Sequence, residues 1–69
     1  MRTKERIDRA AWKFECYFGL STEVFSRGTY RILYDNKKDE IYGWYRTDSS
    51  QLFSEPDAYQ LDLFFEKEV

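Results

Sequence analysis

Residues 29–46 read TYRILYDNKKDEIYGWYR, and this stretch decides the fold. β-Branched and aromatic residues occupy both of its ends, and the polar run DNKKDE separates them. Such residues suit a pleated sheet, and a polar run between two clusters of them is typical of a turn. The stretch therefore predicts a β-hairpin.

The length of the loop sets the register of this hairpin. A turn over residues 36–39 and a tighter turn over Lys37 and Lys38 leave the same residues opposite one another. The expected pairs are Tyr30 with Tyr45, Arg31 with Trp44, Ile32 with Gly43, Leu33 with Tyr42 and Tyr34 with Ile41.

The two faces of the hairpin are both apolar, although an antiparallel sheet normally buries only one. Gly43 lacks a side chain, so we expect a helix to lie close against its face. That buried face would hold Tyr30, Ile32, Ile41 and Tyr45. The opposite face would hold Leu33 and four candidate protein-binding residues, Arg31, Tyr42, Trp44 and Arg46, which are of types enriched at interfaces. In the alternative, Tyr42 and Trp44 are core residues and Arg31 stacks on the Trp44 ring.

Residues 3–18 predict an amphipathic helix that Thr3 caps and Gly19 ends. Its apolar positions recur at helical spacing, at Ile7, Ala11, Phe14 and Phe18. Basic side chains follow the same spacing on a separate face, at Arg2, Arg6, Arg9 and Lys13. They are either a solvated face or a contact line for phosphates or an acidic protein surface.

Residues 20–28 fit two structures. As a strand, the segment runs into a turn at Gly28 and makes a meander with the hairpin. As a short helix capped by Ser21, it places Gly19 in the turn of an arrangement that resembles a helix-turn-helix.

The last third of the chain predicts a turn, a short edge strand over Gln51–Phe53 and a helix over residues 55–67 that Ser54 caps. The expected inward face is Ala58, Leu61, Phe64 and Phe65. An outward acidic stripe holds Glu55, Tyr59, Asp62 and Glu66, and Leu63 joins Tyr59 in an exposed patch. The stripe either keeps the protein soluble or meets a basic surface, and Tyr59, Asp62 and Glu66 are candidate binding residues.

These segments predict one small α+β domain over residues 1–69: a helix, an antiparallel meander of three or four strands, and a helix, with both helices on one face. A chain of 69 residues buries only about 60% of its unfolded surface. Two Trp, six Tyr and six Phe supply the large contact areas that a small domain needs.

Composition also limits the chemistry. The chain has one cysteine and no histidine, which excludes an internal disulfide and the usual zinc sites. Asp35, Asp39 and Glu40 have the composition of a solvated turn rather than of a calcium loop. We therefore expect no enzyme, no metal and no cofactor. The charged start and the lack of a long apolar run predict a cytoplasmic protein without a membrane partner.

The function that the sequence favours is a non-catalytic protein-binding module. It would be a small inhibitor or adaptor that uses the aromatic sheet face and the acidic last helix, as a phage or mobile-element protein directed at a host target would. The formal net charge is −2, with five basic and two acidic side chains in residues 1–14 but one basic and six acidic in residues 47–69. The alternative is a small DNA-binding regulator using Arg2, Arg6, Arg9, Lys13 and Arg27. The second alternative is a self-associating protein whose aromatic face forms a homodimer.

Overall fold

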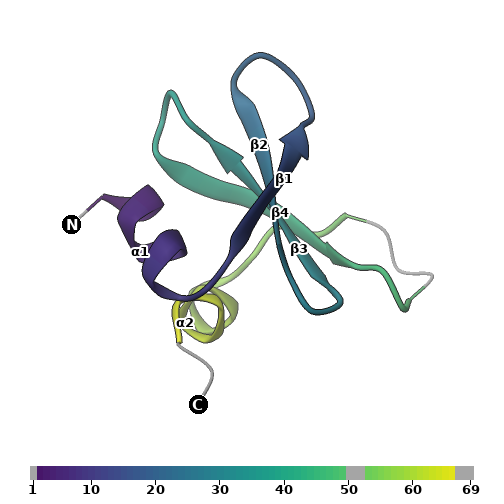
Figure 1. The fold of residues 1–69 in the computed structure, drawn as a ribbon. Coiled ribbons are helices and arrows are strands. Elements are labelled where there is room, and N and C mark those ends of the chain that lie inside the picture. The colour runs from purple at the N-terminus through teal and green to yellow at the C-terminus, as the bar shows by residue number, and fades with distance from the viewer. Residues whose placement is uncertain (1, 50–52, 67–69) are drawn as a thin grey trace.

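The computed structural model describes residues 2–49 and 53–66. The elements follow one another as α1 (Thr3–Arg9), β1 (Lys13–Tyr17), β2 (Thr22–Arg27), β3 (Tyr30–Asp35), β4 (Glu40–Arg46) and α2 (Ala58–Phe65). The four strands form one antiparallel sheet in the order β1-β2-β3-β4 (Figure 1). The predicted α+β arrangement of helix, meander and helix is confirmed.

The first helix is shorter than predicted. It ends at Arg9, and residues 13–17 form an edge strand instead of two further helical turns. Ala11 adopts a left-handed conformation with φ 66°, which ends the helical path. This turn brings Trp12 into the core, where its indole N–H donates to the Phe64 carbonyl at 2.7 Å.

Residues 20–28, for which the sequence allowed a strand or a short helix, contain the strand β2. Thr22–Arg27 pairs with both β1 and β3, so the meander is confirmed and the helix-turn-helix is wrong. Val24 and Phe25 are both buried although they point to opposite faces, as expected of a strand inside a sheet. Gly28 takes φ 63° in the turn that follows.

The hairpin is confirmed, but part of its predicted register is wrong. Tyr34 pairs with Ile41 as expected, whereas Leu33 pairs with Gly43 and Ile32 with Trp44. Tyr42 is the extra residue of a β-bulge, which shifts all later pairs of β4 by one. Trp44 therefore exchanges faces with Tyr45.

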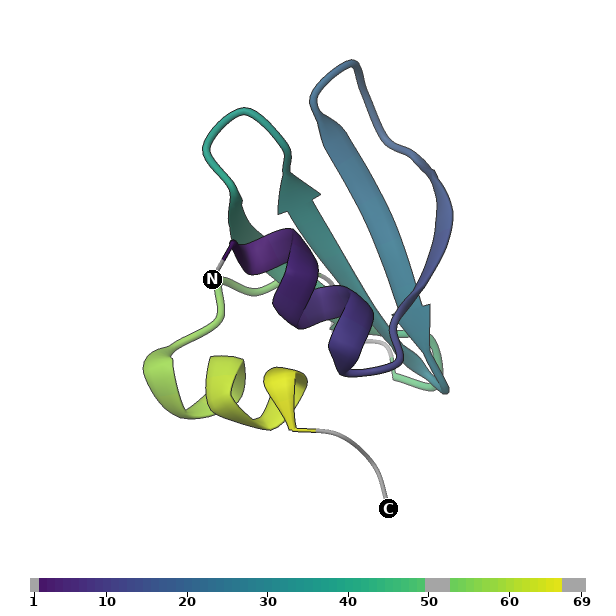
Figure 2. The same ribbon diagram turned by 60° about the vertical axis from the view of Figure 1, so that its left-hand side comes forward.

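Both helices lie on the same face of the sheet, which we name the covered face (Figures 1 and 2). The buried cluster on this face combines residues of both helices with residues of the strands: Ile7, Ala10, Trp12, Phe25, Ile32, Tyr34, Ile41 and Phe64. Tyr30, Trp44, Leu61 and Phe65 pack against it. Burial of Phe64 is as predicted for α2, whereas Ala58 is exposed.

The last helix starts later than predicted. Its N-cap is Asp57, whose carboxylate accepts the backbone N–H of Gln60 at 2.8 Å, and not Ser54. Ser54 instead forms an isolated bridge with Trp44 through two backbone hydrogen bonds of 2.9 and 3.0 Å. The bridge lies close to the predicted edge strand, of which Gln51 and Leu52 are outside the described residues.

Candidate protein-binding surface

The face of the sheet away from the helices, which we name the open face, carries an apolar groove of about 590 Å³. Its lining comes from three strands and two flanking segments, and consists of Phe18, Val24, Leu33, Tyr42, Tyr45 and Phe53. Val24 and Leu33 are buried, whereas Phe18 is 75% and Phe53 50% exposed. The groove therefore has a buried aliphatic floor between exposed aromatic walls.

Gly43 is needed on this open face rather than on the covered one. A Cβ atom at Gly43 would lie 1.9 Å from Cε2 of the Phe53 ring, so the ring rests directly on the Gly43 backbone. The prediction that Gly43 admits a helix is wrong, because the bulge turns Gly43 to the opposite face and the Phe53 ring occupies the space.

Tyr42 and Tyr45 are the strand aromatics of the groove. The hydroxyls of Tyr42 and Thr22 form a hydrogen bond of 2.9 Å, and the Tyr42 ring centre lies 6.1 Å from that of Phe53. Tyr42 thus lies on the open face as predicted. The sequence predicts Tyr45 in the core, but the bulge at Tyr42 turns Tyr45 to the open face. No feature of the loop sequence reveals this bulge.

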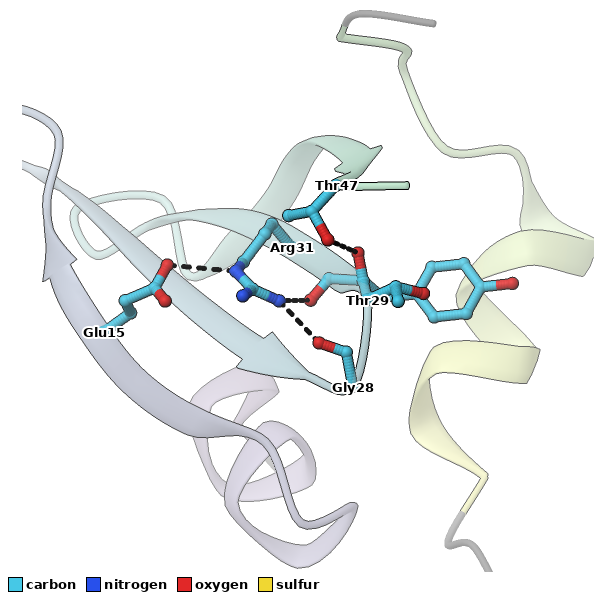
Figure 3. Close-up of polar contacts among 6 residues, drawn as sticks. Glu15, Gly28, Thr29, Arg31 and Thr47 are labelled. Carbon is cyan, nitrogen blue, oxygen red and sulfur yellow. Dashed lines mark hydrogen bonds and ion pairs between the residues drawn. The ribbon is translucent and has the colours of Figure 1, made fainter. Parts of the chain in front are cut away.

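Arg31 lies on the open face and is held in place (Figure 3). Its Nε donates to Glu15 Oε2 at 3.0 Å, and its Nη1 donates to the carbonyls of Gly28 and Tyr30 at 2.8 and 2.9 Å. These bonds fix the guanidinium at the β2–β3 turn, so it does not stack on Trp44. A fixed, partly neutralised arginine at the border of an apolar groove costs little side-chain entropy when a partner binds.

Trp44 and Arg46 lie on the covered side, so the structure separates them from Arg31 and Tyr42. The Trp44 ring centre is 5.5 Å from that of Phe64, within the core. Arg46 lies over the Tyr30 ring and donates to Asp48 at 2.8 and 3.0 Å, and this hydrogen bond raises the pKa of Arg46. The predicted placement of both residues on the interaction face is wrong for the same reason, the one-residue shift in β4.

The predicted acidic stripe is only partly helical: Tyr59 and Asp62 lie on α2, whereas Glu55 precedes the helix and Glu66 is its C-cap. Tyr59 is 72% exposed, and Glu55, Asp62 and Glu66 are also exposed. Leu63 adds apolar area beside Tyr59, as predicted. Because α2 packs on the covered face, this stripe is a second surface that is not continuous with the groove.

The predicted basic line does not form. Arg2, Arg6 and Arg9 belong to α1 or its N-cap, but Lys13 lies on β1, and the Arg6 guanidinium stacks over the Phe65 ring at 3.9 Å. Arg2, Arg9 and Lys13 are exposed.

Arg27, which was grouped with the basic line, is a structural residue. Its Nη1 donates to the carbonyls of Ala10, Phe64 and Glu66 at 2.9, 3.2 and 2.9 Å, and its guanidinium lies 4.5 Å from the centre of the Trp12 ring. It therefore joins the ends of both helices to the end of β2. The C-terminal carbonyls of α2 have no glycine cap, and Arg27 satisfies several of them. The lack of a glycine after α2 is the one sequence signal of this role.

Asp39 is the second charged residue with a structural role, although the sequence placed it in a solvated turn. Its carboxylate accepts the backbone N–H groups of Thr3 and Lys4 at 2.9 and 3.2 Å, and the Tyr34 hydroxyl also donates to it. It caps α1 from a distant loop, so the predicted cap by Thr3 is wrong. The hydrogen bond from Tyr34 and those from the backbone lower the pKa of Asp39, while burial and Asp39 raise the pKa of Tyr34 to about 12.

Within residues 2–49 and 53–66, no three His, Cys, Asp or Glu side chains gather as a metal ion would require. In the same part of the chain, no helix is long and apolar enough to span a membrane. Comparison with known proteins finds no matching family model, no similar curated protein and no similar solved structure.

Proposed function

We propose that this chain is a non-catalytic protein-binding module, acting as a small inhibitor or adaptor, and that it binds its target with the groove of the open face. The observation that carries the proposal is the pair of exposed aromatic walls, Phe18 and Phe53, over the buried floor of Val24 and Leu33. Contiguous apolar surface of this kind is costly in water unless a partner covers it.

The groove favours an apolar segment of a protein target. Its walls are rings, its floor is aliphatic, and Arg31 on the same face is already paired with Glu15. Tyr42 and Tyr45 add hydroxyl groups to apolar rings, a combination that is enriched at binding hot spots. We therefore expect binding that depends weakly on salt, because screening acts mainly on exposed charges.

A DNA-binding function draws less support from the fold. Arg27 is engaged with backbone carbonyls, Arg6 is stacked on Phe65, and no helix-turn-helix is formed by residues 3–27. Of the other three predicted residues, Arg2 and Arg9 belong to α1 or its N-cap and Lys13 to β1, so the predicted single basic stripe is interrupted.

The test is photo-crosslinking in a lysate of the source cell, with a benzoyl-substituted phenylalanine in place of Phe53. A matched protein carries the same probe in place of Tyr59, which is exposed on α2. We expect one discrete protein adduct from the Phe53 probe, unaffected by nuclease and by salt, and none of the same mass from the Tyr59 probe.

The variant Phe53→Ser, added unlabelled, should fail to compete for that adduct, while Tyr59→Ser should compete like the wild type. Adducts that disappear with nuclease would contradict the proposal, as would equal labelling from the two probe positions. Trp44→Ala is not a usable variant, because Trp44 packs in the core.

A further inference from the structure

The strand β1 forms an edge of the sheet that no other described segment covers. All five of its residues are exposed, whereas the opposite edge, β4, is bridged by Ser54. Phe18 donates its backbone N–H to the Thr22 carbonyl, so in the alternating antiparallel pattern Tyr17 directs its own N–H and C=O toward the free edge. An edge of this kind is a template for another strand.

The side chains of this edge follow an unusual order. Phe14 pairs with Phe25 and Tyr17 with Glu23, which places both on the covered face with their ring centres 5.1 Å apart. Lys13 pairs with Ser26 and Cys16 with Val24, and Glu15 reaches Arg31, so these three lie on the open face. Phe18 lines the open groove.

From residue 13 to residue 18 the faces therefore run open, covered, open, open, covered, open. The bulge between Phe14 and Cys16 creates the two consecutive open positions. This order reads the same in both directions along the strand. In a strand without a bulge the side chains alternate strictly between the two faces. Paired with β1, such a strand would place its side chains on the same faces as those of β1 on only one side of the bulge.

We propose that β1 pairs antiparallel with β1 of a second copy, so that two sheets of four strands join into one continuous sheet around a two-fold axis between Glu15 and Cys16. In this register Phe14 lies opposite the partner's Tyr17, Glu15 opposite the partner's Cys16, and Lys13 opposite the partner's Phe18. Every side chain meets one on the same face. This interface shares Phe18 with the groove of the proposed function, whereas Phe53, Tyr42 and Leu33 of the groove lie away from β1.

The exposed area suits a weak dimer. Phe14 is 49%, Tyr17 65% and Phe18 75% exposed, and together they offer roughly 400 Å² of side-chain surface per copy. A standard stable interface uses about 800 Å² per partner. Exposed parts of Lys13, Glu15 and Cys16 and the strand backbone add to this area, and the total stays below that of a standard stable interface, so we expect a concentration-dependent dimer.

Sedimentation equilibrium from about 1 μM to about 1 mM tests the dimer. In the variant Tyr17→Pro the outward N–H is lost while the hydrogen bonds to β2 stay, so the monomer fold is kept and the dissociation constant rises at least about tenfold. Tyr17→Lys, a variant without the backbone change, should also weaken the dimer, and Tyr59→Ser should not. A monomer throughout this range would overturn the proposal, as would a dimer that both Tyr17 variants leave unchanged.

Cys16 checks the register because it is the only cysteine. Across the proposed axis the two Cys16 Cα atoms lie about 6 Å apart, within the range that a disulfide bridges. Diamide, which accepts the two thiol hydrogens, should therefore convert the wild-type dimer to a disulfide-linked one, at least about tenfold faster than in Tyr17→Pro. A dimer that depends on Tyr17 but forms no Cys16 disulfide would refute this register.

Discussion

Replacing Gly43 with Ala places a methyl group where the Phe53 ring now lies. The added Cβ would be 1.9, 2.1 and 2.9 Å from three ring carbons, whereas carbon atoms in ordinary contact are about 3.5–4.0 Å apart. The backbone of Gly43 can accept Ala, since the positive φ among the described glycines belongs to Gly28. The clash is therefore with one side chain, and the ring must leave its place on β4.

The magnitude follows from the exposure of that ring. Phe53 is half exposed, so losing its packing forfeits about half of the 1.5–3 kcal/mol that full burial contributes, or about 1 kcal/mol. Against this, Ala is favoured over Gly inside a strand by about 0.5–1 kcal/mol. Gly43→Ala should thus be near neutral or slightly destabilising in the wild type, but stabilising by about 0.5–1 kcal/mol when Phe53 is already Ala.

The assay is a double-mutant cycle of the wild type, Gly43→Ala, Phe53→Ala and the double variant. Urea unfolding followed by tryptophan fluorescence gives the free energy of unfolding of each, since Trp12 is buried and Trp44 packs against the core. We expect a coupling of about 1 kcal/mol between the two positions. Additivity within about 0.3 kcal/mol would show that the ring does not rest on Gly43.

Three further predictions concern the covered face. Phe64→Ala should lower the free energy of unfolding by about 3–5 kcal/mol, because Phe64 is 2% exposed and packs edge-on against two tryptophan rings. Thermal unfolding followed by circular dichroism measures this loss, and a loss below about 1 kcal/mol would contradict the prediction. Arg27→Met should lower the free energy of unfolding by about 1–3 kcal/mol, and Arg27→Lys should lower it similarly, because an ammonium cannot reach the same set of carbonyls. Hydrogen exchange should show faster exchange of the amides at the end of α2. A Lys variant as stable as the wild type would contradict this role of Arg27. The pKa of Asp39 in the folded protein lies below the ordinary 3.8, so the stability that Asp39 contributes is present above pH 3.8 and is lost as pH falls through the lowered pKa. The pKa of Tyr34 is raised to about 12, so the stability that Tyr34 contributes is lost as pH rises from about 10 toward 12. Urea midpoints measured across pH should show both slopes, and Asp39→Asn should flatten the acid slope.

The residue types predicted the helices and strands correctly where the local secondary-structure preference of a segment agrees with the pattern of its buried side chains. The hairpin, the meander and the placement of both helices on one face follow from aromatic and β-branched strands flanked by amphipathic segments. Phe64 was recognised as inward because the apolar period of α2 is that of a helix.

The errors in the register of β4 and in the faces of its residues share one physical cause, the β-bulge at Tyr42. A bulge puts residues three apart on the same face, as Phe14 and Tyr17 are on β1 and Ile41 and Trp44 are on β4. The predicted helical stripe joined Phe14 to Phe18, but the bulge places these two residues on opposite faces of the sheet. Bulges and the left-handed turn at Ala11 depend on contacts with distant residues, so a local pattern does not reveal them.

The roles of Arg27 and Asp39 were missed for a related reason. Each charge satisfies backbone groups of segments more than fifteen residues away, and single residues of this kind carry no periodic signal. A surface assignment is the usual outcome for such residues, since charged side chains are mostly exposed.

The bond from the Trp12 indole to the Phe64 carbonyl joins positions 52 residues apart. Until Phe64 is present, Trp12, Tyr30 and Trp44 lack the aromatic ring that packs against all three of them. Long-range closure of this kind slows folding and leaves apolar surface open meanwhile. We expect a released chain that ends before α2 to bind chaperones through this apolar surface, and a chain that includes residues 58–66 not to bind them.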